Sequence, residues 1–281
     1  MGKPMAEKLI EAEYDLKIYN RTAGKAESLI KIGAKTFSDV NELANNSDVI
    51  IMMLSNYDAI QEVLFESNIS QLENKTIIQM STIAPTESIE LKSRVEKLRG
   101  EYFEAPVLGS INQILDKELI VLVGSNEIQF AKYKKMFESF SKKIMYIGEV
   151  GKASAIKLAL NQLIISETAA FSMSLGYVRE NNLNIETFMD ILRSSALYAQ
   201  TFDKKLPNYL ERNFENPNFP VKHLLKDLDL MLNEFADKNI NTDILKGIRK
   251  ILVDSIKTGN SDKDYSAIYN SIHIKKDWTP T

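Results

Sequence analysis

The sequence predicts a doubly wound α/β domain followed by an all-α domain. Strand-like apolar segments alternate with helical segments over the first half of the chain, the pattern of a parallel sheet covered by helices. Residues 48–54 form a near-continuous apolar run, which is typical of a strand buried on both faces. Beyond Gly151 only helical periodicity remains. The predicted domains are therefore residues 1–150 and residues 151–281.

Each element of the first domain has its own local signal. The first ten residues read as a helix with Pro4 in its first turn, where a missing N–H is harmless. Strands are expected at alternating or continuous apolar segments, namely residues 15–19, 48–54, 75–80, 102–107, 119–123 and 143–147. Helices are expected between them, at residues 23–32, 57–65, 85–98 and 127–140. In the second domain, breaks are expected near Asn182, Pro207 and residues 217–220.

The composition excludes several kinds of binding partner and site. The 281 residues carry 35 basic and 38 acidic side chains, so there is no electrostatic reason to expect nucleic acid as a partner. No cysteine is present, which rules out disulfides, thiolate nucleophiles and cysteine metal sites. No apolar run is long enough to span a bilayer, so neither a membrane nor a signal segment is expected. The expected location is the cytoplasm.

Polar residues follow several of the predicted strands. Residues 20–22 follow the first visible strand, Ser55 follows the second, and Ser81 and Thr82 follow the third. In an open α/β sheet, ligands bind beyond such carboxyl ends. A Rossmann domain that prefers NAD carries an acidic residue at the end of its second strand, whereas Arg21 offers a guanidinium suited to the 2′-phosphate of NADP. A plain surface turn is the alternative at Arg21. Ser81 or Thr82 can also cap the following helix, which is compatible with a ligand contact.

A long helix after residue 150 carries two polar residues on one face. Lys157 and Asn161 are four residues apart in an otherwise apolar stretch, so their side chains lie one turn from each other. A buried ammonium is costly unless it is paired or takes part in chemistry. Lys157 is therefore either paired or takes part in chemistry, and the alternative is a lysine whose amine reaches the rim of an ordinary core helix.

Five short segments look like the motifs of one enzyme family. They are residues 1–6, 19–22, 104–110, 148–161 and 219–228. In this order and at this spacing they resemble the β-hydroxyacid dehydrogenase family. This family includes 3-hydroxyisobutyrate dehydrogenases and glyoxylate/succinic semialdehyde reductases, and it is similar to 6-phosphogluconate dehydrogenase. The resemblance covers essentially the whole chain.

The resemblance implies an NADPH-dependent reductase of a small aldehyde or 2-oxo acid, with residues 1–150 as an NADP-binding Rossmann domain and residues 151–281 as an all-helical substrate and oligomerisation domain. Lys157 would be the general acid/base, and Asn161 would orient the substrate. The substrate-binding residues would be Thr82, Leu108, Gly109, Ser110, Phe219 and Asp227. The cofactor-binding residues would be Gly2, Asn20, Arg21, Thr22, Leu54, Ser55, Thr82 and Lys226. No metal is expected, and a homodimer or homotetramer is implied.

Three departures from the family pattern affect these expectations. Leu108 replaces a serine that contacts the substrate carboxylate in many members, which disfavours glyoxylate. Ala153 replaces a common glycine, a small change. Of the glycine loop only Gly2 is present. We expect the strands ending at Tyr19 and Met80 to lack their shared neighbour, and an apolar strand with a glycine-rich turn to precede Met1.

Two other functions remain open. One is an NAD-dependent oxidation of a 3-hydroxy acid, against which Arg21 argues. The other is a non-catalytic binding protein descended from such an enzyme. The incomplete glycine loop favours it, and the presence of Lys157, Asn161 and Asp227 disfavours it.

Overall fold

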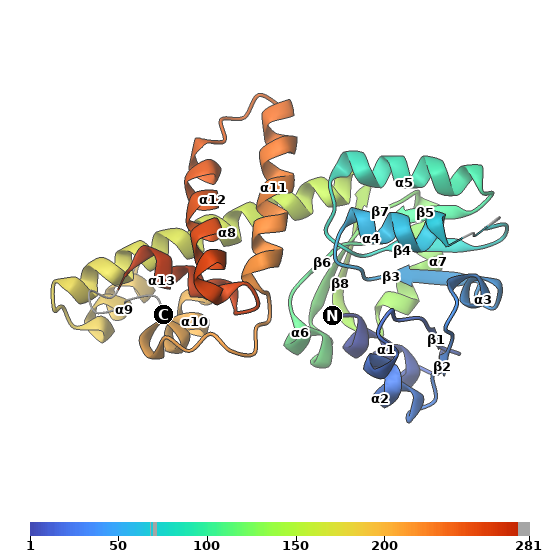
Figure 1. The fold of residues 1–281 in the computed structure, drawn as a ribbon, viewed down its shortest axis with the longest axis horizontal. Helices are drawn as coiled ribbons and strands as arrows, with labels where there is room; N and C mark the ends of the chain where they lie inside the picture. The colour runs from blue at the N-terminus through green and yellow to red at the C-terminus, as the bar shows by residue number, and fades with distance from the viewer. Residues whose placement is uncertain (68, 70–71, 275–281) are drawn as a thin grey trace. The chain divides into compact units, whose positions relative to one another are not determined.

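The computed structural model describes residues 1–67, 69 and 72–274 (Figure 1). The chain forms two compact units, Met1–Leu158 and Ala159–Thr281. Helix α8 (Lys152–Glu180) begins in the first unit and continues into the second. The first unit contains sheets flanked by helices, and the second contains helices, as the sequence predicts for an α/β domain followed by an all-α domain.

The main sheet of the first unit has six strands. β3, β4 and β5 are parallel to one another, and β7 lies antiparallel to β5 and β6 but parallel to β8. The strands are β3 (Val49–Met52), β4 (Thr76–Gln79), β5 (Glu101–Glu104), β6 (Val107–Leu108), β7 (Leu119–Gly124) and β8 (Ser141–Gly148). This is the parallel core of a Rossmann-like sheet, with an antiparallel extension.

A second, separate sheet consists, in the described part of the chain, of β1 (Lys17–Ile18) and β2 (Lys35–Thr36), which are parallel. The sheet is interrupted, as expected, and the strand that ends near Tyr19 lies at the gap. The expectation that the strand ending near Met80 also lies there is wrong. The strand that ends near Met80 is β4, and it is paired on both sides, with β3 and with β5. Among the described strands, β3 lies at the open edge of the main sheet, with β4 as its neighbour.

Helices cover both faces of the main sheet. On one face, Ile78 and Phe103 pack in a core with α1 (Gly2–Glu11), α6 (Ile111–Leu115) and α7 (Glu127–Phe137). On the other face, their chain neighbours Ile77 and Tyr102 pack with α3 (Val40–Asn45), α4 (Tyr57–Gln61) and α5 (Pro85–Lys97). This alternation follows from the two-residue period of a strand.

Several elements differ from the sequence prediction. The helix expected at residues 23–32 is two short pieces, η1 (Ala23–Ala26) and α2 (Glu27–Ile30). The helix expected at residues 57–65 ends in a π-helical segment, η2 (Glu62–Glu66). β2, α3 and α6 were not predicted, because segments of two to six residues carry too little periodicity.

The second unit is built from helices around α8. The further helices are α9 (Ile185–Arg193), α10 (Gln200–Glu211), α11 (Val221–Asp237), α12 (Asp243–Ser255), η3 (Ile256–Asn260), η4 (Tyr265–Ile268) and α13 (Tyr269–Ile272). The Phe171 ring of α8 stacks on Phe202 of α10 at 4.5 Å between centroids. In the ranges that the structure describes, none of the helices is both long enough and apolar enough to cross a membrane.

The break expected at Pro207 is wrong. Pro207 lies inside α10, and the helix ends at Glu211, followed by Arg212 with a left-handed φ of 51°. An interior proline removes one backbone hydrogen bond. Burial of Phe202, Leu206 and Tyr209 on the same helix offsets this loss and keeps α10 continuous.

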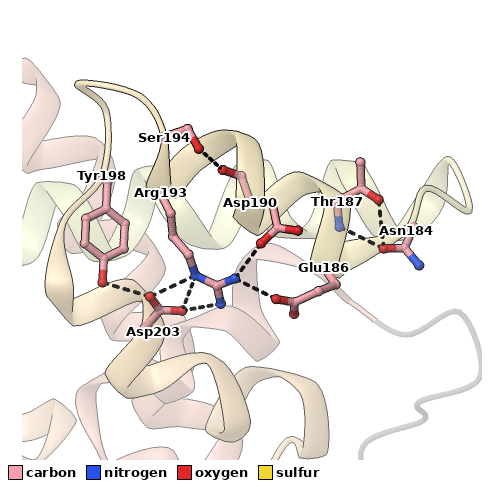
Figure 2. A network of polar contacts seen from close by, with 8 residues as sticks. All are labelled: Asn184, Glu186, Thr187, Asp190, Arg193, Ser194, Tyr198 and Asp203. Carbon is pink, nitrogen blue, oxygen red and sulfur yellow. Dashed lines mark hydrogen bonds and ion pairs between the residues drawn. The ribbon is translucent and has the colours of Figure 1, made fainter.

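A charged network joins α9 to α10 (Figure 2). The Arg193 guanidinium donates to both carboxylate oxygens of Asp203 and also to Glu186 and Asp190. Tyr198 donates its hydroxyl to Asp203 at 2.8 Å. Arg193 and the Tyr198 hydroxyl lower the pKa of Asp203, so the network remains charged at neutral pH. It fixes the loop between the two helices.

Candidate active site

The first unit contains a cavity of about 1460 Å³ that runs along β1 and β3 and includes their carboxyl ends. Most of the residues expected to bind the cofactor line it. They are Gly2, Asn20, Arg21, Thr22, Leu54 and Ser55. A Cβ atom built on Gly2 would lie 3.7 Å from Met53, an ordinary van der Waals contact, so the space at the start of α1 does not by itself require a glycine. Asn20, Arg21, Thr22 and Ser55 make the strand-end part of this lining polar.

Arg21 is placed to bind an anion. Its side chain is 84% exposed, and its ion pair with Glu62 is long, at 3.9 Å. The preceding Asn20 accepts a hydrogen bond from the Thr22 N–H at 2.9 Å, which shapes the turn and leaves the guanidinium outside it. The turn contains no carboxylate that would repel a phosphate. The residues present therefore fit a phosphorylated nucleotide ligand.

The end of β3 is fixed by the neighbouring strand. The Leu54 N–H donates to the Ser81 hydroxyl at 2.8 Å, and Ser81 is buried. Ser81 thus joins the carboxyl ends of β3 and β4, rather than capping the next helix. That helix, α5, has Ala84 as its N-cap residue, and the Ala84 N–H donates to Glu87.

Two expected cofactor residues do not line the cavity. Thr82 is half-buried just beyond β4 and is absent from the lining, and Lys226 belongs to α11 in the second unit. Lys226 lies 2.7 Å from the Asp227 carboxylate, so it has an ion-pair partner of its own.

The expected substrate loop is a tight turn between β6 and α6. Gly109 has a φ of 132°, which other residues rarely adopt, and a Cβ built there would come 2.8 Å from Leu119 Cδ1, so a substitution would be strained. Ser110 is the N-cap of α6, where its hydroxyl donates to Gln113 at 2.5 Å. Leu108 is half-buried at the end of β6. The structure therefore gives Gly109 and Ser110 structural roles in addition to any contact with a ligand.

The candidate catalytic residues lie in α8 and α11. Lys157 is 9% exposed, and Asn161 follows it by one turn of α8 at 2%. The Asn161 side-chain amide donates to Asp227 of α11 at 2.7 Å, and Asp227 is also 2% exposed. The buried Asn161 Oδ1 has no hydrogen-bond partner among the described residues. A buried acceptor without a partner is costly, and a ligand donor would satisfy it.

The start of α8 is held by a carboxylate that sequence reasoning did not assign a role. Glu104, at the end of β5, is completely buried. Its Oε1 accepts the backbone N–H groups of Gly151, Ala153 and Ser154 at 2.8 to 3.1 Å, and its Oε2 accepts the Ser154 hydroxyl at 2.6 Å. These N–H groups would otherwise be unsatisfied, and the carboxylate complements the positive end of the helix. Glu104 thus anchors the helix that carries Lys157 to the sheet.

A family model for the NAD-binding domain of 6-phosphogluconate dehydrogenase matches residues 1–148. This is more than half of the chain. The chain belongs to the β-hydroxyacid dehydrogenase family. A second model, described as the NAD-binding domain of NADP-dependent 3-hydroxyisobutyrate dehydrogenase, matches residues 151–272.

Individual proteins agree with this membership. The chain is 27% identical to glyoxylate/succinic semialdehyde reductase 1 of Arabidopsis thaliana over 99% of its length and 96% of the relative's. It is 30% identical to an uncharacterized oxidoreductase of Bacillus subtilis over 97% of its length and 96% of that protein. Its fold matches 3-hydroxyisobutyrate dehydrogenase of Mycobacterium tuberculosis with a TM-score of 0.87, at 20% identity, over 97% of this chain and 95% of the other.

As a member of this β-hydroxyacid dehydrogenase family, the chain is a nicotinamide-dependent oxidoreductase that acts on hydroxyl or carbonyl groups. The cavity at the ends of β1 and β3 is consistent with this class. In the part of the chain that the structure describes, no group of three or more acidic or histidine side chains could hold a metal ion.

The family's C-terminal motif, residues 219–228, is held by a buried ion pair in the second unit. Lys205 donates to Asp264 at 2.6 Å, and both side chains are buried. Asp264 forms a β-bridge with Pro220, and the following Tyr265 N–H donates to the Phe219 carbonyl. Within the motif, burial and the nearby lysines lower the pKa of His223, so its imidazole is neutral at pH 7.

Proposed function

We propose that this dehydrogenase reduces a small aldehyde or 2-oxo acid with NADPH, and that Lys157 is the proton donor. The observation that carries the proposal is the arrangement on α8. A largely buried lysine lies one turn from Asn161, whose amide Asp227 holds in place and whose Oδ1 is left without a partner. At buried positions, alanine or leucine would pack better than these polar residues. Packing alone therefore does not explain their presence.

The chemistry follows from these residue types. Bound NADPH would supply the hydride to the carbonyl carbon. Negative charge then develops on the carbonyl oxygen, and the Lys157 ammonium can donate a proton to it, which gives the alcohol and a neutral amine. Asn161 Oδ1 would accept a hydrogen bond from the hydroxyl group of the alcohol product, and its partner Asp227 fixes the orientation of the amide. In the oxidative direction the neutral amine would act as the base.

Cofactor preference tests the role of Arg21. We expect Arg21→Ala to weaken NADPH binding by about ten- to a hundredfold and to leave NADH binding nearly unchanged, because charge-assisted hydrogen bonds contribute roughly 1.5–3 kcal/mol. Fluorescence titration with both nicotinamides measures this. Arg249→Ala, which removes another exposed arginine with one carboxylate partner, is the matched control. Equal binding of NADPH and NADH by the unmodified protein would show that the assignment is wrong.

Leu108 tests the substrate class. We expect glyoxylate to be a poor substrate, and Leu108→Ser to raise kcat/KM for small 2-oxo acids by about tenfold, since a hydroxyl can bind the carboxylate that leucine cannot. Leu115→Ser, which changes an exposed leucine of the adjacent helix α6, should have no effect. An unchanged kcat/KM for Leu108→Ser would mean that this residue does not contact the substrate.

Turnover assays with both nicotinamides separate the proposed function from the two alternatives. A non-catalytic binding protein would show no turnover with any carbonyl compound, whether or not NADPH binds. An NAD-dependent 3-hydroxy acid dehydrogenase would have the lower Michaelis constant for NAD. The Asn20-Arg21 turn supports the NADP-dependent reductase over the NAD-dependent dehydrogenase. The presence of Lys157, Asn161 and Asp227 supports an enzyme over a binding protein.

We also propose a homo-oligomer. Within the second unit, α8 exposes large apolar side chains that a partner would cover: Leu163 at 52%, Met173 at 60% and Tyr177 at 70%. Light scattering on the purified protein should give the mass of a dimer or tetramer, and Met173→Glu should lower it.

A further inference from the structure

The chain contains two histidines, and their surroundings differ. The His273 ring has a partner at each nitrogen, because Nδ1 lies 2.9 Å from Arg212 Nη2 and Nε2 lies 2.7 Å from a carboxylate oxygen of Glu180. Among the described residues, the His223 imidazole has no hydrogen-bond partner, although its side chain is half-buried. Burial removes water from such a ring, so a half-buried imidazole without a protein partner is a candidate to bind a ligand.

His223 lies on the side of α11 that carries Asp227. The two residues are four positions apart, so their side chains project about 40° from each other around the helix axis, with Cβ atoms roughly 5–6 Å apart. Asp227 is buried and accepts the hydrogen bond of the Asn161 amide, and all three residues belong to the second unit. His223 is therefore one helical turn from the carboxylate that holds Asn161.

The backbone of the first turn of α11 is already fixed. The N–H groups of Val221 and Lys222 donate to carbonyls of residues 261–263 at 2.9 and 3.1 Å. The His223 N–H donates to the Pro220 carbonyl at 3.0 Å. These donors would be unsatisfied at an ordinary helix start. Because they are used here, the His223 ring, and not its backbone N–H, is the group that this turn can offer to a ligand.

The charges around His223 favour an anion. Burial lowers the pKa of its imidazole, and the nearby Lys226 and Lys222 lower it further. Asp227 and Asp262, which follows η3, raise the pKa by less than the two lysines lower it. The ring is therefore neutral at pH 7 and lies in a positive potential. A neutral imidazole keeps one N–H, which can donate to a carboxylate.

We infer that His223 is a specificity-determining residue, whose imidazole N–H binds a substrate carboxylate at the end of the molecule away from the reacting carbonyl. The inference rests on the proposed function, in which the reacting oxygen lies at Lys157 and Asn161. A carboxylate bonded directly to the carbonyl carbon is too close to that oxygen to span one helical turn. A carboxylate two or more carbons away reaches His223, so the substrate class is an aldehyde with a distant carboxylate.

The presence of two histidines allows a direct test by NMR. The full chain, with labelled histidine and bound NADP, is titrated from about pH 5 to 8 with 4-hydroxybutanoate or with its uncharged counterpart butan-1-ol. In the His223→Gln protein the remaining histidine signal is that of His273, which assigns both signals. A bound carboxylate favours the protonated ring, so 4-hydroxybutanoate should raise the midpoint of the His223 titration by about one pH unit. Butan-1-ol should not raise it, and His273 should respond to neither compound.

Steady-state kinetics separate substrate binding from a purely structural role. His223→Leu should raise KM for 4-oxobutanoate about tenfold and change kcat by less than about threefold, because the lost hydrogen bond does not involve the reacting atoms. KM for butanal, which has no carboxylate, should stay within about twofold. His223→Gln keeps an N–H donor and should restore most of the affinity for 4-oxobutanoate.

The outcomes distinguish this inference from the proposed function. An unchanged His223 midpoint with 4-hydroxybutanoate, or an equal rise in KM for 4-oxobutanoate and butanal, would overturn the inference. If neither aldehyde is turned over, the proposed function fails for these compounds. The NMR titration still decides the role of His223 in that case, because it reports carboxylate binding without turnover.

Discussion

Replacing Lys157 by methionine should lower kcat by a factor of about 10²–10⁴, the usual contribution of a general acid. Methionine removes the ammonium and keeps a similar length, so it fills the space of this nearly buried side chain without leaving a charge. NADPH affinity should stay within a factor of about two or three of the unmodified protein, since Arg21 and the strand ends that line the cavity are unchanged. Steady-state kinetics and a fluorescence titration measure the two quantities.

Lys152→Met is the matched control for this experiment. Lys152 is an exposed lysine in the first turn of the same helix, so the substitution removes an equal charge from α8. It should leave kcat within about a factor of three. A Lys157→Met protein that retains more than about a tenth of the unmodified turnover would show that proton transfer does not depend on this residue.

Replacing Glu104 by alanine should destabilise the first unit by at least about 3 kcal/mol. The substitution leaves three buried N–H groups at the start of α8 without an acceptor, and each costs about 1–3 kcal/mol. In a protein of this size the Tm should fall by roughly 6–12 °C. Differential scanning calorimetry measures the change. Glu101→Ala, an exposed glutamate on the same strand, should shift Tm by less than about 2 °C.

The same contact can be tested from the opposite strand. Glu104 lies across from Gly124 of β7, and a Cβ built on Gly124 would come 2.5 Å from Glu104 Oε1. Gly124→Ala should therefore also lower Tm, because the carboxylate would have to move away from α8. Gly247→Ala offers a contrast, since an added Cβ there meets nothing within 4 Å and the glycine lies inside helix α12. If the two glycine variants unfold at the same temperature, the close packing at Glu104 has no energetic consequence.

Most of the fold was predictable because its signals are local. The apolar run that forms β3, the Pro4 in the first turn of α1 and the uninterrupted helical pattern of α8 each require only neighbouring residues in the chain. The positions of Asn20, Arg21 and Ser55 at one cavity followed from the rule that strand ends share an edge.

What escaped prediction depends on contacts between distant segments. Glu104 bonds to residues 47 to 50 positions later, and Asn161 bonds to Asp227, 66 positions later. A single sequence contains no periodicity that reports such pairs. One signal was available, since Glu104 is a lone carboxylate in the apolar segment 102–107, where an unpartnered charge would be costly. The strand at the open edge of the sheet was misassigned because the register of β3 and β4 is likewise non-local.

Transfer of isotope from NADPH tests the central claim most directly. Purified protein is incubated with aldehydes and 2-oxo acids and with NADPH deuterated at the nicotinamide carbon that donates hydride, and the products are analysed by NMR and mass spectrometry. The proposed reductase should place one deuterium on the carbinol carbon of at least one product, and the Lys157→Met protein should form that product at least about a hundredfold more slowly. A protein that binds NADPH but transfers deuterium to none of these compounds, or that transfers it equally fast without Lys157, would contradict this mechanism.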